Sequence, residues 1–388
     1  MNGLAWTGRC VVARRSASRH TSISPTETSY PKTGVTAYRP PENPILSPAM
    51  VRSSRAELEV VGVFNPAAIQ NAGEVVLLVR VAEAARGVPN GMIASPIHDA
   101  ATQRLTIRQW DRLAPGVDVS DPRMLVADGR TWLTSISHLR VARSSDGIHF
   151  DVEPTPALSA STPYESFGVE DPRITRIDGT YWISYTAVSP YGIATGLAST
   201  KDFRAFERHG IIFPPNNRDV TIFPERIEGR FRALHRPMPS GLGEVAIWCA
   251  SSDDMISWGD HQLVAMARDG GWDDSKVGGG AVPFRVRSHG VDGWLAVYHG
   301  VTKSSGAYSL GALLLSANDP SRVIARSRYP ILAPEAAYER QGFYGGVVFT
   351  CGLLAQDDRV RVYYGAADGV TAVADLSLKW ILSGLGDP

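Results

Sequence analysis

The sequence predicts an all-β protein, a five-bladed β-propeller with an active-site pocket on its axis. Three observations lead to this fold class. Short strand-like segments recur along the chain, a turn rich in Ser and Asp recurs in step with them, and apolar residues show almost no 3.6-residue period. Radial blades fit this combination better than a sandwich or a helical solenoid does.

The recurring strand segments each begin with a turn containing Gly or Asp and continue with aromatic and β-branched residues. They begin near positions 73, 129, 179, 229, 293 and 357, with the sequences GEVVLLVRV, GRTWLTSISH, GTYWISYTAV, GRFRALHRP, DGWLAVYHGV and DDRVRVYYGAAD. A spacing of about 50 to 65 residues is long enough for a four-stranded blade. Five blades fit the chain length, with six strand segments if the two ends pair to close the ring.

Two further elements keep the same spacing. A Ser/Asp turn followed by an aromatic residue occurs at Ser144, Ser199 and Ser251. Polar strand starts precede the strand segments in SDPRML, EDPRIT and FPERI, which contain Asp121, Asp171 and Phe223. The first strand of each propeller blade lines the central channel, so polar residues at these starts are expected to converge on the axis.

Composition excludes several classes of partner. The 388 residues include 39 Lys plus Arg and 39 Asp plus Glu, so no net charge favours a nucleic acid or an anionic membrane. No stretch approaches the roughly 20 apolar residues of a membrane-spanning helix. The three cysteines match neither a metal site nor a disulfide framework. We therefore expect a cytoplasmic protein.

The expected domain organisation is a disordered leader, residues 1–40, followed by a catalytic propeller domain, residues 41–380. The leader is basic and rich in Ser, Thr and Pro, and it lacks the apolar segment of a secretory signal. An organelle transit peptide and an overlong start-site assignment are the alternatives for this segment.

Polar residues at the inner strand starts and at strand ends are the candidates for chemistry. Arg side chains can hold phosphate or carboxylate oxygens with two parallel hydrogen bonds, so a phosphate pocket is one interpretation. Salt bridges between blades are the other interpretation for each charge taken singly. The candidates are Asn65, Arg86, Asp121, Asp171, Arg218, Asp219, His235, Arg236, Lys276, His299, Tyr308 and Asp368.

Nucleotide and metal sites have little support in the sequence. The glycine run KVGGGAVP lacks the residue order of a P-loop, and no helical pattern follows it. No histidine pair lies three or four residues apart with a third ligand nearby, so no metal is predicted. Asp121 and Asp171 share the tripeptide DPR, which commonly starts a turn, and Asp121 is expected to have that structural role.

Five segments carry a resemblance to a known family: GVEDPRI, NNRDVTIFPERIEGRFRALHRP, GWDDSKVGGG, GWLAVYHGV and YYGAAD. In their order and spacing they resemble glycoside hydrolase family 130. With ENPILSP and ARSRYPILAPEAAYE, the resemblance covers roughly residues 40 to 375. It implies a five-bladed β-propeller with an axial pocket, in agreement with the repeats, and chemistry on β-D-mannosides.

The resemblance implies that Asp171, the aspartate of the GxxDPR segment, is the general acid. Phosphorylases of the family protonate the glycosidic oxygen indirectly, through a hydroxyl of the bound mannose. Phosphate attacks the anomeric carbon from the opposite face, so the configuration inverts and α-mannose 1-phosphate forms. Inverting hydrolysis requires a second carboxylate to activate water, whereas phosphate is already an anionic nucleophile.

The family's ligand contacts fall on residues of suitable type here. The positions that resemble its phosphate contacts are all basic, namely Arg218, Arg236, Lys276 and His299. This set is reduced in the water-using mannosidases of the family, so its retention favours phosphorolysis, with phosphate as co-substrate and no cofactor. Positions that resemble its sugar contacts are Asn65, Arg86 and Asp368, with Tyr308 in the same pocket.

Two alternatives stay open at this level. An inverting β-mannosidase would use Asp171 as acid and Glu225 or Asp219 as base, and would release mannose without phosphate. A non-catalytic propeller would only bind mannan or N-glycan fragments in the axial pocket. Gly345 and Gly346 stand where many relatives have Pro-Asn, so acceptor preference is open, as are the linkage and a homo-oligomeric state.

Overall fold

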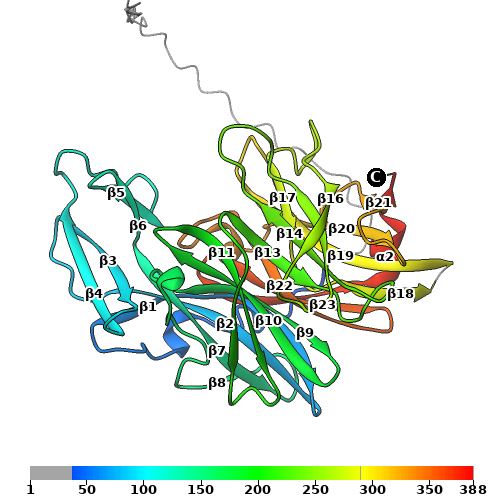
Figure 1. The fold of residues 1–388 in the computed structure, drawn as a ribbon, viewed down its shortest axis with the longest axis horizontal. Coiled ribbons are helices and arrows are strands. Elements are labelled where there is room, and N and C mark those ends of the chain that lie inside the picture. The colour runs from blue at the N-terminus through cyan, green and yellow to red at the C-terminus, as the bar shows by residue number, and fades with distance from the viewer. Residues whose placement is uncertain (1–36, 289, 388) are drawn as a thin grey trace, which may run out of the picture. The chain divides into compact units, whose positions relative to one another are not determined.

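Five antiparallel sheets follow one another along the described part of the chain and form the blades of a β-propeller (Figure 1). The structure is a computed structural model that describes residues 37–288 and 290–387. The predicted leader lies outside these residues, apart from positions 37–40. These described residues belong to one compact unit.

Each blade is built from strands that are close in the sequence. Blade 1 contains β1 (Leu58–Asn71), β2 (Glu74–Ala85), β7 (Ser135–Ser144) and β8 (Asp151–Val152). Blade 2 contains β9 (Val169–Ile177), β10 (Thr180–Ser189), β11 (Gly192–Thr200) and β12 (Glu207–Phe213). Blade 3 contains β13 (Asn217–Ile222), β14 (Phe231–Pro237), β15 (Ile247–Ser252) and β16 (Gly259–Ala265).

Blades 4 and 5 complete the ring. Blade 4 contains β17 (Lys276–Gly279), β18 (Phe284–Ser288), β19 (Val291–Val301), β20 (Tyr308–Ser316), β21 (Val323–Ser327) and β25 (Leu385–Gly386). Blade 5 contains β22 (Val348–Gln356), β23 (Arg359–Ala366) and β24 (Val370–Ser377). The short helices are η1 (Pro48–Met50), η2 (Pro163–Glu165), α1 (Ala337–Arg340) and α2 (Leu378–Ser383).

The start of the described chain pairs with the last strand of blade 5. Tyr38 forms a β-bridge with Asp375, and Leu46 forms one with Thr371, both in β24. The segment before β1 thus lies beside the last strand of blade 5. This pairing closes the ring in the way that the repeat pattern predicts.

Apolar clusters lie between successive blades and hold them together. Between blades 1 and 2, for example, Val76 of β2 packs in one cluster with Ile183 of β10, and both side chains are fully buried. Between blades 4 and 5, Leu295 of β19 shares a cluster with Val362 of β23. Full burial of such a side chain contributes about 1.5–3 kcal/mol, so these contacts between sheets stabilise the ring.

One of the six predicted strand segments does not form the second strand of a blade. The segment near position 129 forms β6 (Arg130–Leu133) and the start of β7, the third strand of blade 1. Two hairpins are inserted between β2 and β7. One consists of β3 (Met92–Asp99) and β4 (Arg104–Asp111), and the other of β5 (Met124–Ala127) and β6. We call residues 91–134 the arm.

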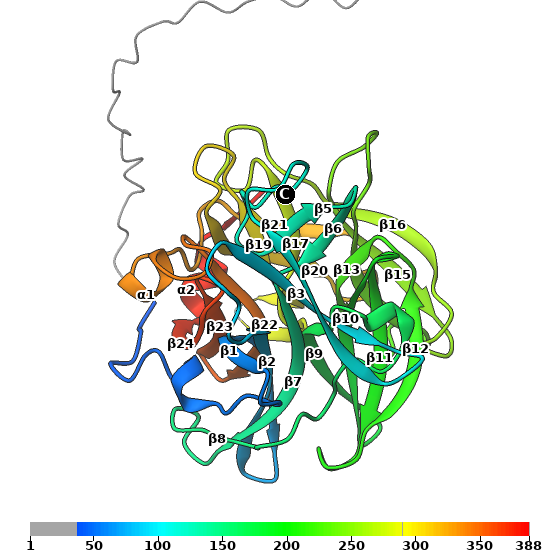
Figure 2. The ribbon, with the colours of Figure 1, turned by 90° about the vertical axis from the view of Figure 1, so that its left-hand side faces the viewer.

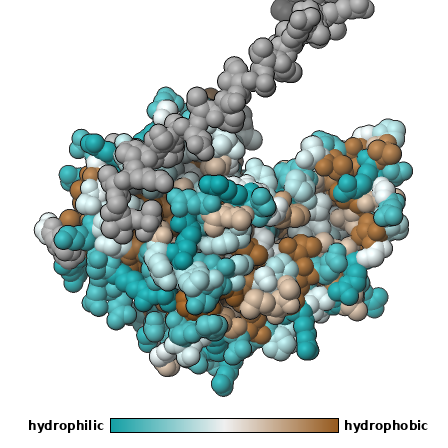
Figure 3. Space-filling model, turned by 180° about the vertical axis from the view of Figure 1, so that it is seen from behind, coloured by the Kyte–Doolittle hydropathy of each residue, from teal (hydrophilic) through white to brown (hydrophobic). Residues whose placement is uncertain are grey.

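The arm projects from blade 1 and faces the viewer in Figure 2. A small apolar cluster joins the arm to blade 2, and in it Trp132 packs against Trp110 of the arm and against Phe167, two residues before β9. One buried face is enough to impose strand-like alternation, which is why the sequence of the arm resembles that of a blade. Hydrophobic residues are also visible on the projecting arm in Figure 3, where Leu113 is 91% exposed.

Candidate active site

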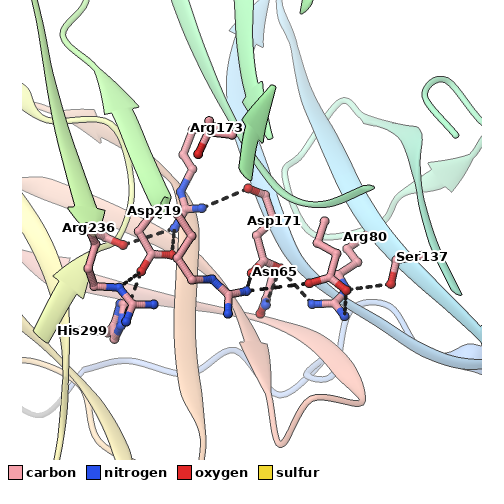
Figure 4. Close-up of polar contacts among 12 residues, drawn as sticks. Asn65, Arg80, Ser137, Asp171, Arg173, Asp219, Arg236 and His299 are labelled. Carbon is pink, nitrogen blue, oxygen red and sulfur yellow. Dashed lines mark hydrogen bonds and ion pairs between the residues drawn. The ribbon is translucent and has the colours of Figure 1, made fainter. Parts of the chain in front are cut away.

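Three inner strands bring polar side chains to the axis by the same local device. Asn65 of β1, Asp171 of β9 and Asp219 of β13 have positive φ angles of 51°, 48° and 58°. Each lies where the pairing register shifts against the neighbouring strand, as in a β-bulge. A bulge re-aims a side chain, and Asn and Asp adopt the left-handed conformation more readily than most residues do. Repetition of this bulge therefore gathers the three side chains at the centre (Figure 4).

The carboxylate of Asp171 is buried among hydrogen-bond donors. Asn65 Nδ2 donates to Asp171 Oδ1 at 2.9 Å, and Arg80 Nη1 donates to the same oxygen at 3.2 Å. Arg218 Nη2 lies 3.7 Å from Oδ2. Burial raises the pKa of Asp171, but the charges of Arg80, Arg218 and Arg173 and the Asn65 hydrogen bond outweigh it, so the net pKa is lowered. Asp171 is therefore ionised in the absence of ligand.

Glu170 is a second buried carboxylate beside Asp171. Arg80 Nη2 donates to Glu170 Oε1 at 2.8 Å, and Arg218 Nη2 lies 3.7 Å from Oε2. Burial raises the pKa of Glu170, and the Asp171 charge adds to this effect, while Arg80 and Arg218 oppose it. The net pKa is raised.

Asp219 organises a second group of charges on the other side of Asp171 (Figure 4). Its Oδ2 accepts a hydrogen bond from Arg236 Nε at 2.6 Å, and its Oδ1 accepts one from Arg173 Nη2 at 3.2 Å. Burial raises the pKa of Asp219, but Arg236, His299 and Arg173 outweigh it and the net pKa is lowered. Asp219 is therefore ionised and fully engaged with cations.

His299 contributes a neutral ring to this group. Its Nε2 lies 3.8 Å from Asp219 Oδ2, and its ring is almost fully buried. Burial lowers the pKa of His299 to about 3, Asp219 opposes the shift, and Arg236 and Lys276 add to it. At neutral pH His299 can therefore offer a hydrogen bond but no charge.

Lys276 and Tyr308 extend the group towards blade 4. Lys276 Nζ lies 5.0 Å from the centroid of the Tyr308 ring, and that ring stacks on His299 with centroids 5.9 Å apart. Within the described part of the chain, no carboxylate lies within 4.0 Å of Lys276 Nζ. With the free nitrogens of Arg218 and Arg236, this ammonium gives the site an excess of positive charge for an anion.

The glycine run that begins in β17 of blade 4 makes this close approach of charges possible. A Cβ atom at Gly278 would meet Asp219 Oδ2 at 2.6 Å and Arg236 Nε at 2.7 Å, and it would also clash with His299. Only glycine fits there without displacing the cluster. The run KVGGGAVP therefore supports the ionic cluster and is not a nucleotide loop.

Asp368, predicted above as a sugar contact, interacts electrostatically with the Asp171 group. Its pKa is raised to about 6, first by burial and then by the charges of Asp171 and Glu170, while Arg80 and Arg123 oppose the shift. It also has a positive φ of 51°. The turn after β23 thus places Asp368 within electrostatic reach of the Asp171 group.

The structure does not bring Arg86 to this cluster. Arg86 is exposed and lines a surface pocket with Pro48, Ser54 and Glu59. The arginine that reaches Asp171 is Arg80, in the middle of β2, whose guanidinium also lies 4.6 Å from the centroid of the Phe64 ring. We therefore replace Arg86 by Arg80 in the proposed sugar-side set, because β2 directs Arg80 inward while Arg86 follows the end of the strand.

The other predicted candidates lie apart from Asp171. Asp121 is in the arm, where it pairs with its own neighbour Arg123. His235 is buried beside Arg236 in sequence and makes hydrogen bonds to Asn217 and His261, each at 3.0 Å. Glu225, one proposed base of the hydrolase alternative, is exposed.

Sequence reasoning missed three residues that hold Asp171 and Asp219 in place, namely Arg80, Glu170 and Arg173. Arg80 had a usable signal, because a charge inside the apolar run VVLLVRVA is costly unless it is paired. Glu170 precedes the DPR motif and Arg173 is the arginine of that motif, and their partners on other blades become visible only in three dimensions.

The described residues contain neither a candidate metal cluster nor a helix that could span a membrane. In residues 37–288 and 290–387, no group of three or more His, Cys, Asp or Glu side chains could hold a metal ion. Within the same residues, every helix is too short and too polar to cross a membrane.

Comparison with known proteins identifies the family of this site. A family model described as beta-1,4-mannooligosaccharide phosphorylase, glycoside hydrolase family 130, matches residues 123–385. The chain is 42% identical to a Listeria innocua beta-1,2-mannobiose phosphorylase over 349 residues, 89% of this chain and 97% of the relative. It is 32% identical to a Ruminococcus albus beta-1,4-mannooligosaccharide phosphorylase, over 61% of this chain and 72% of the relative.

A solved structure gives the same result. The beta-1,2-mannobiose phosphorylase from Listeria innocua, in complex with beta-1,2-mannobiose, superposes with a TM-score of 0.86 at 41% identity, and covers 90% of this chain and 99% of its own. The chain therefore belongs to glycoside hydrolase family 130.

Proposed function

We propose that this chain catalyses the inverting phosphorolysis of short β-1,2-linked mannosides, with Asp171 as general acid. The observation that carries the proposal is the position of Arg218. Its guanidinium lies 3.7 Å from Asp171 Oδ2 and within electrostatic reach of Asp219, the carboxylate that Arg236 and His299 contact. An anion held by these groups therefore lies next to the acid.

The reaction follows from this arrangement. A phosphate oxygen attacks the anomeric carbon, and the bond from that carbon to the glycosidic oxygen breaks. A proton from Asp171 passes through a mannose hydroxyl to the leaving oxygen. The products are α-mannose 1-phosphate and a sugar shortened by one mannose. Because the nucleophile is an anion, no second carboxylate is needed to activate it.

Phosphate binding also explains how Asp171 obtains the proton that a general acid must donate. The Arg218 charge is among the groups that lower the pKa of Asp171 in the free protein. Phosphate bound to Arg218 and Arg236 offsets those cations and adds negative charge, and both effects raise the pKa of a nearby carboxyl group. We infer that Asp171 becomes protonated when phosphate occupies the site.

The β-1,2 linkage is supported by the relatives. The Listeria innocua protein that carries a beta-1,2-mannobiose name is matched over nearly its whole length. A Thermoanaerobacter 1,2-beta-oligomannan phosphorylase is 41% identical over 63% of this chain and 80% of the relative. The relative with a β-1,4 name is less similar, at 32% identity.

The two carboxylates named as bases for the hydrolase alternative do not suit that role in this geometry. Glu225 is exposed, and Asp219 is held by Arg236 and Arg173 with a lowered pKa. A carboxylate that is ion-paired in this way is a weak acceptor of a proton from water. A propeller that only binds sugars would require neither the buried carboxylate of Asp171 nor a lysine, Lys276, that has no carboxylate partner nearby.

Predictions on co-substrate, location and oligomeric state are also part of the proposal. Phosphate is a co-substrate and no cofactor is expected. The cytoplasmic location and a homo-oligomeric state also stay predictions.

The test uses the full chain with α-mannose 1-phosphate and mannose, glucose or N-acetylglucosamine as acceptor, and it follows phosphate release. We expect release with mannose and no release in Asp171→Asn. Release of free mannose from β-1,2-mannobiose in the absence of phosphate would overturn the proposal in favour of hydrolysis.

A further inference from the structure

The second DPR motif of the chain holds an arginine rigidly in the arm. Asp121 accepts hydrogen bonds from Arg123 Nε at 3.0 Å and Nη2 at 2.8 Å, and its Oδ1 also accepts one from the Arg123 backbone N–H at 2.9 Å. A bidentate carboxylate fixes the plane of a guanidinium. Nη1 of Arg123 is not engaged by Asp121 and is available to a ligand.

The guanidinium of Arg123 lies against an aromatic ring from the opposite end of the chain. Its Cζ is 4.0 Å from the centroid of the Tyr344 ring, a cation–π contact that joins the arm to the loop before β22. Both side chains are half-buried and therefore partly accessible.

The loop that carries Tyr344 is tied to both sugar-side residues of the site. The backbone N–H of Tyr344 donates to the carbonyl of Ala367, the residue before Asp368, at 3.0 Å. Two residues later, the carbonyl of Gly346 accepts from the N–H of Tyr308 at 2.9 Å. Tyr344 and Tyr308 also pack against one apolar cluster. The position of Tyr344 is therefore fixed relative to Tyr308 and Asp368.

The charge of Arg123 faces the catalytic group as well. It opposes the rise in the pKa of Asp368 and of Glu170, which places its guanidinium within electrostatic reach of both. The contact between Arg123 and Tyr344 thus lies at the edge of the site and not on the outer surface of the arm.

We propose that Arg123 and Tyr344 form a wall of the acceptor subsite and set the preference for the sugar that leaves in phosphorolysis. This inference rests on the proposed function. Tyr344 offers an aromatic surface to the sugar ring, and Arg123 Nη1 offers a donor to its hydroxyls. Asp121 is a positioning residue that acts through Arg123, which gives the second DPR motif a use.

A purely structural contact between arm and loop is the competing explanation, and the kinetics separate the two. In synthesis from α-mannose 1-phosphate and mannose, Arg123→Ala and Tyr344→Ala should each raise the KM for mannose about tenfold, the loss of one or two good contacts. The KM for α-mannose 1-phosphate should stay within about twofold, because that substrate occupies the other half of the site. Asp121→Asn should give a smaller rise in the same direction.

The matched control is Arg108→Ala, which removes another cation–π contact of the arm, 5.0 Å from the Trp132 ring. It should leave the KM for mannose unchanged. The inference is overturned if Arg123→Ala and Tyr344→Ala keep the wild-type KM for mannose, or if they raise it no more than Arg108→Ala does.

A binding measurement separates failure of this inference from failure of the proposed function. Calorimetry with β-1,2-mannobiose needs no turnover, and Arg123→Ala should weaken that binding about tenfold while binding of α-mannose 1-phosphate is retained. If the chain lacks phosphorolytic activity but Arg123→Ala still weakens mannobiose binding, the proposed function is wrong and the subsite is supported. Unchanged mannobiose binding in an active chain would sink the subsite alone.

Discussion

Arg173 Nη2 donates a hydrogen bond to Asp219 Oδ1 at 3.2 Å, with both side chains about 1% exposed. The same guanidinium donates from Nη1 to the backbone carbonyl of Asp171 at 3.0 Å. One arginine of blade 2 thus links the proposed acid to the carboxylate that organises the phosphate side. The two halves of the site are therefore parts of one buried network.

Loss of the Asp219 charge is expected to destabilise the protein. Asp219→Asn leaves Arg173 and Arg236 without their shared counterion, and breaking a buried pair in this way costs about 3–5 kcal/mol. Urea unfolding at neutral pH measures the change. Asp357→Asn is the matched control, since Asp357 also has a positive φ, of 52°, but is exposed. Equal stability of the two variants would contradict the network.

Asp171→Asn should remove the acid and lower kcat for phosphorolysis by about 10²–10⁴-fold, the usual contribution of general acid catalysis. The amide keeps the shape of the side chain, so mannobiose binding should persist. Asp178→Asn in the turn between β9 and β10 is the control, because Asp178 has a similar φ of 50° and is exposed. Steady-state kinetics with near-normal activity in Asp171→Asn would exclude this residue as the acid.

Arg80 and Arg86 should respond differently to the same substitution. Arg80→Ala removes the hydrogen bonds to Asp171 and Glu170 and should lower kcat/KM for mannobiose by about 10²-fold or more, as expected for loss of a buried charge-assisted contact. Arg86→Ala removes an exposed side chain and should leave kcat/KM unchanged. The reverse order of effects would restore Arg86 as the sugar contact.

Lys276→Met should act mainly on phosphate. The Lys276 ammonium lies over the Tyr308 ring. A hydrogen bond from a charged group contributes about 1.5–3 kcal/mol, so its loss should raise the KM for phosphate roughly 10- to 150-fold. The KM for mannobiose should change far less. Initial rates at varied phosphate give both values, with Lys201→Met, at an exposed lysine, as the control. Equal changes in both KM values would argue against a phosphate contact.

The pH dependence of stability should report on Asp368. Its pKa of about 6 in the folded protein lies above the ordinary value of about 3.9. Between about pH 4 and 6 the unfolded chain has released the Asp368 proton while the folded protein still holds it. The free energy of unfolding of the wild type therefore falls by up to about 3 kcal/mol over this range, and the loss is complete above pH 6. Asp368→Asn removes this loss, so its stability relative to wild type should rise from pH 4 to 6 and then level off.

Urea unfolding of both proteins at pH 4, 5, 6 and 7.5 measures the difference. Taking the difference matters because buried His299, whose pKa is lowered to about 3, makes an opposite contribution that is lost as pH falls below about 6.5. That contribution is common to both proteins and cancels. A difference that does not vary with pH would show that Asp368 has an ordinary pKa.

The repeats predicted the fold correctly because strand alternation and turn chemistry are local properties. The segments near 179, 229, 293 and 357 became the second strands of four blades, β10, β14, β19 and β23. The segment near 129 was misassigned to a blade because the arm also buries one face of each hairpin. Local patterning does not distinguish a hairpin that packs in the ring from one that packs on itself.

The site was predicted in part for the same reason. Asn65, Asp171 and Asp219 lie on inner strands, and the repeats place such strands near the axis. Arg80 was overlooked because its burial depends on the register of β2 against β7, which pairs Arg80 with Leu139. A charged side chain inside an apolar run indicates that the charge must be paired, but the sequence does not show that its partner lies on another blade.

The sequence by itself determined the strand content, the five-blade ring, the family resemblance and the identity of Asp171 as the candidate acid, since these depend on spacing along the chain. Only the tertiary structure decided that Arg80, not Arg86, meets that acid, that His299 is neutral, and that Arg123 of the arm stacks on Tyr344. Those relationships join residues from different blades and depend on burial. Distance and desolvation, which set ion pairs and pKa values, exist only after the ring has closed.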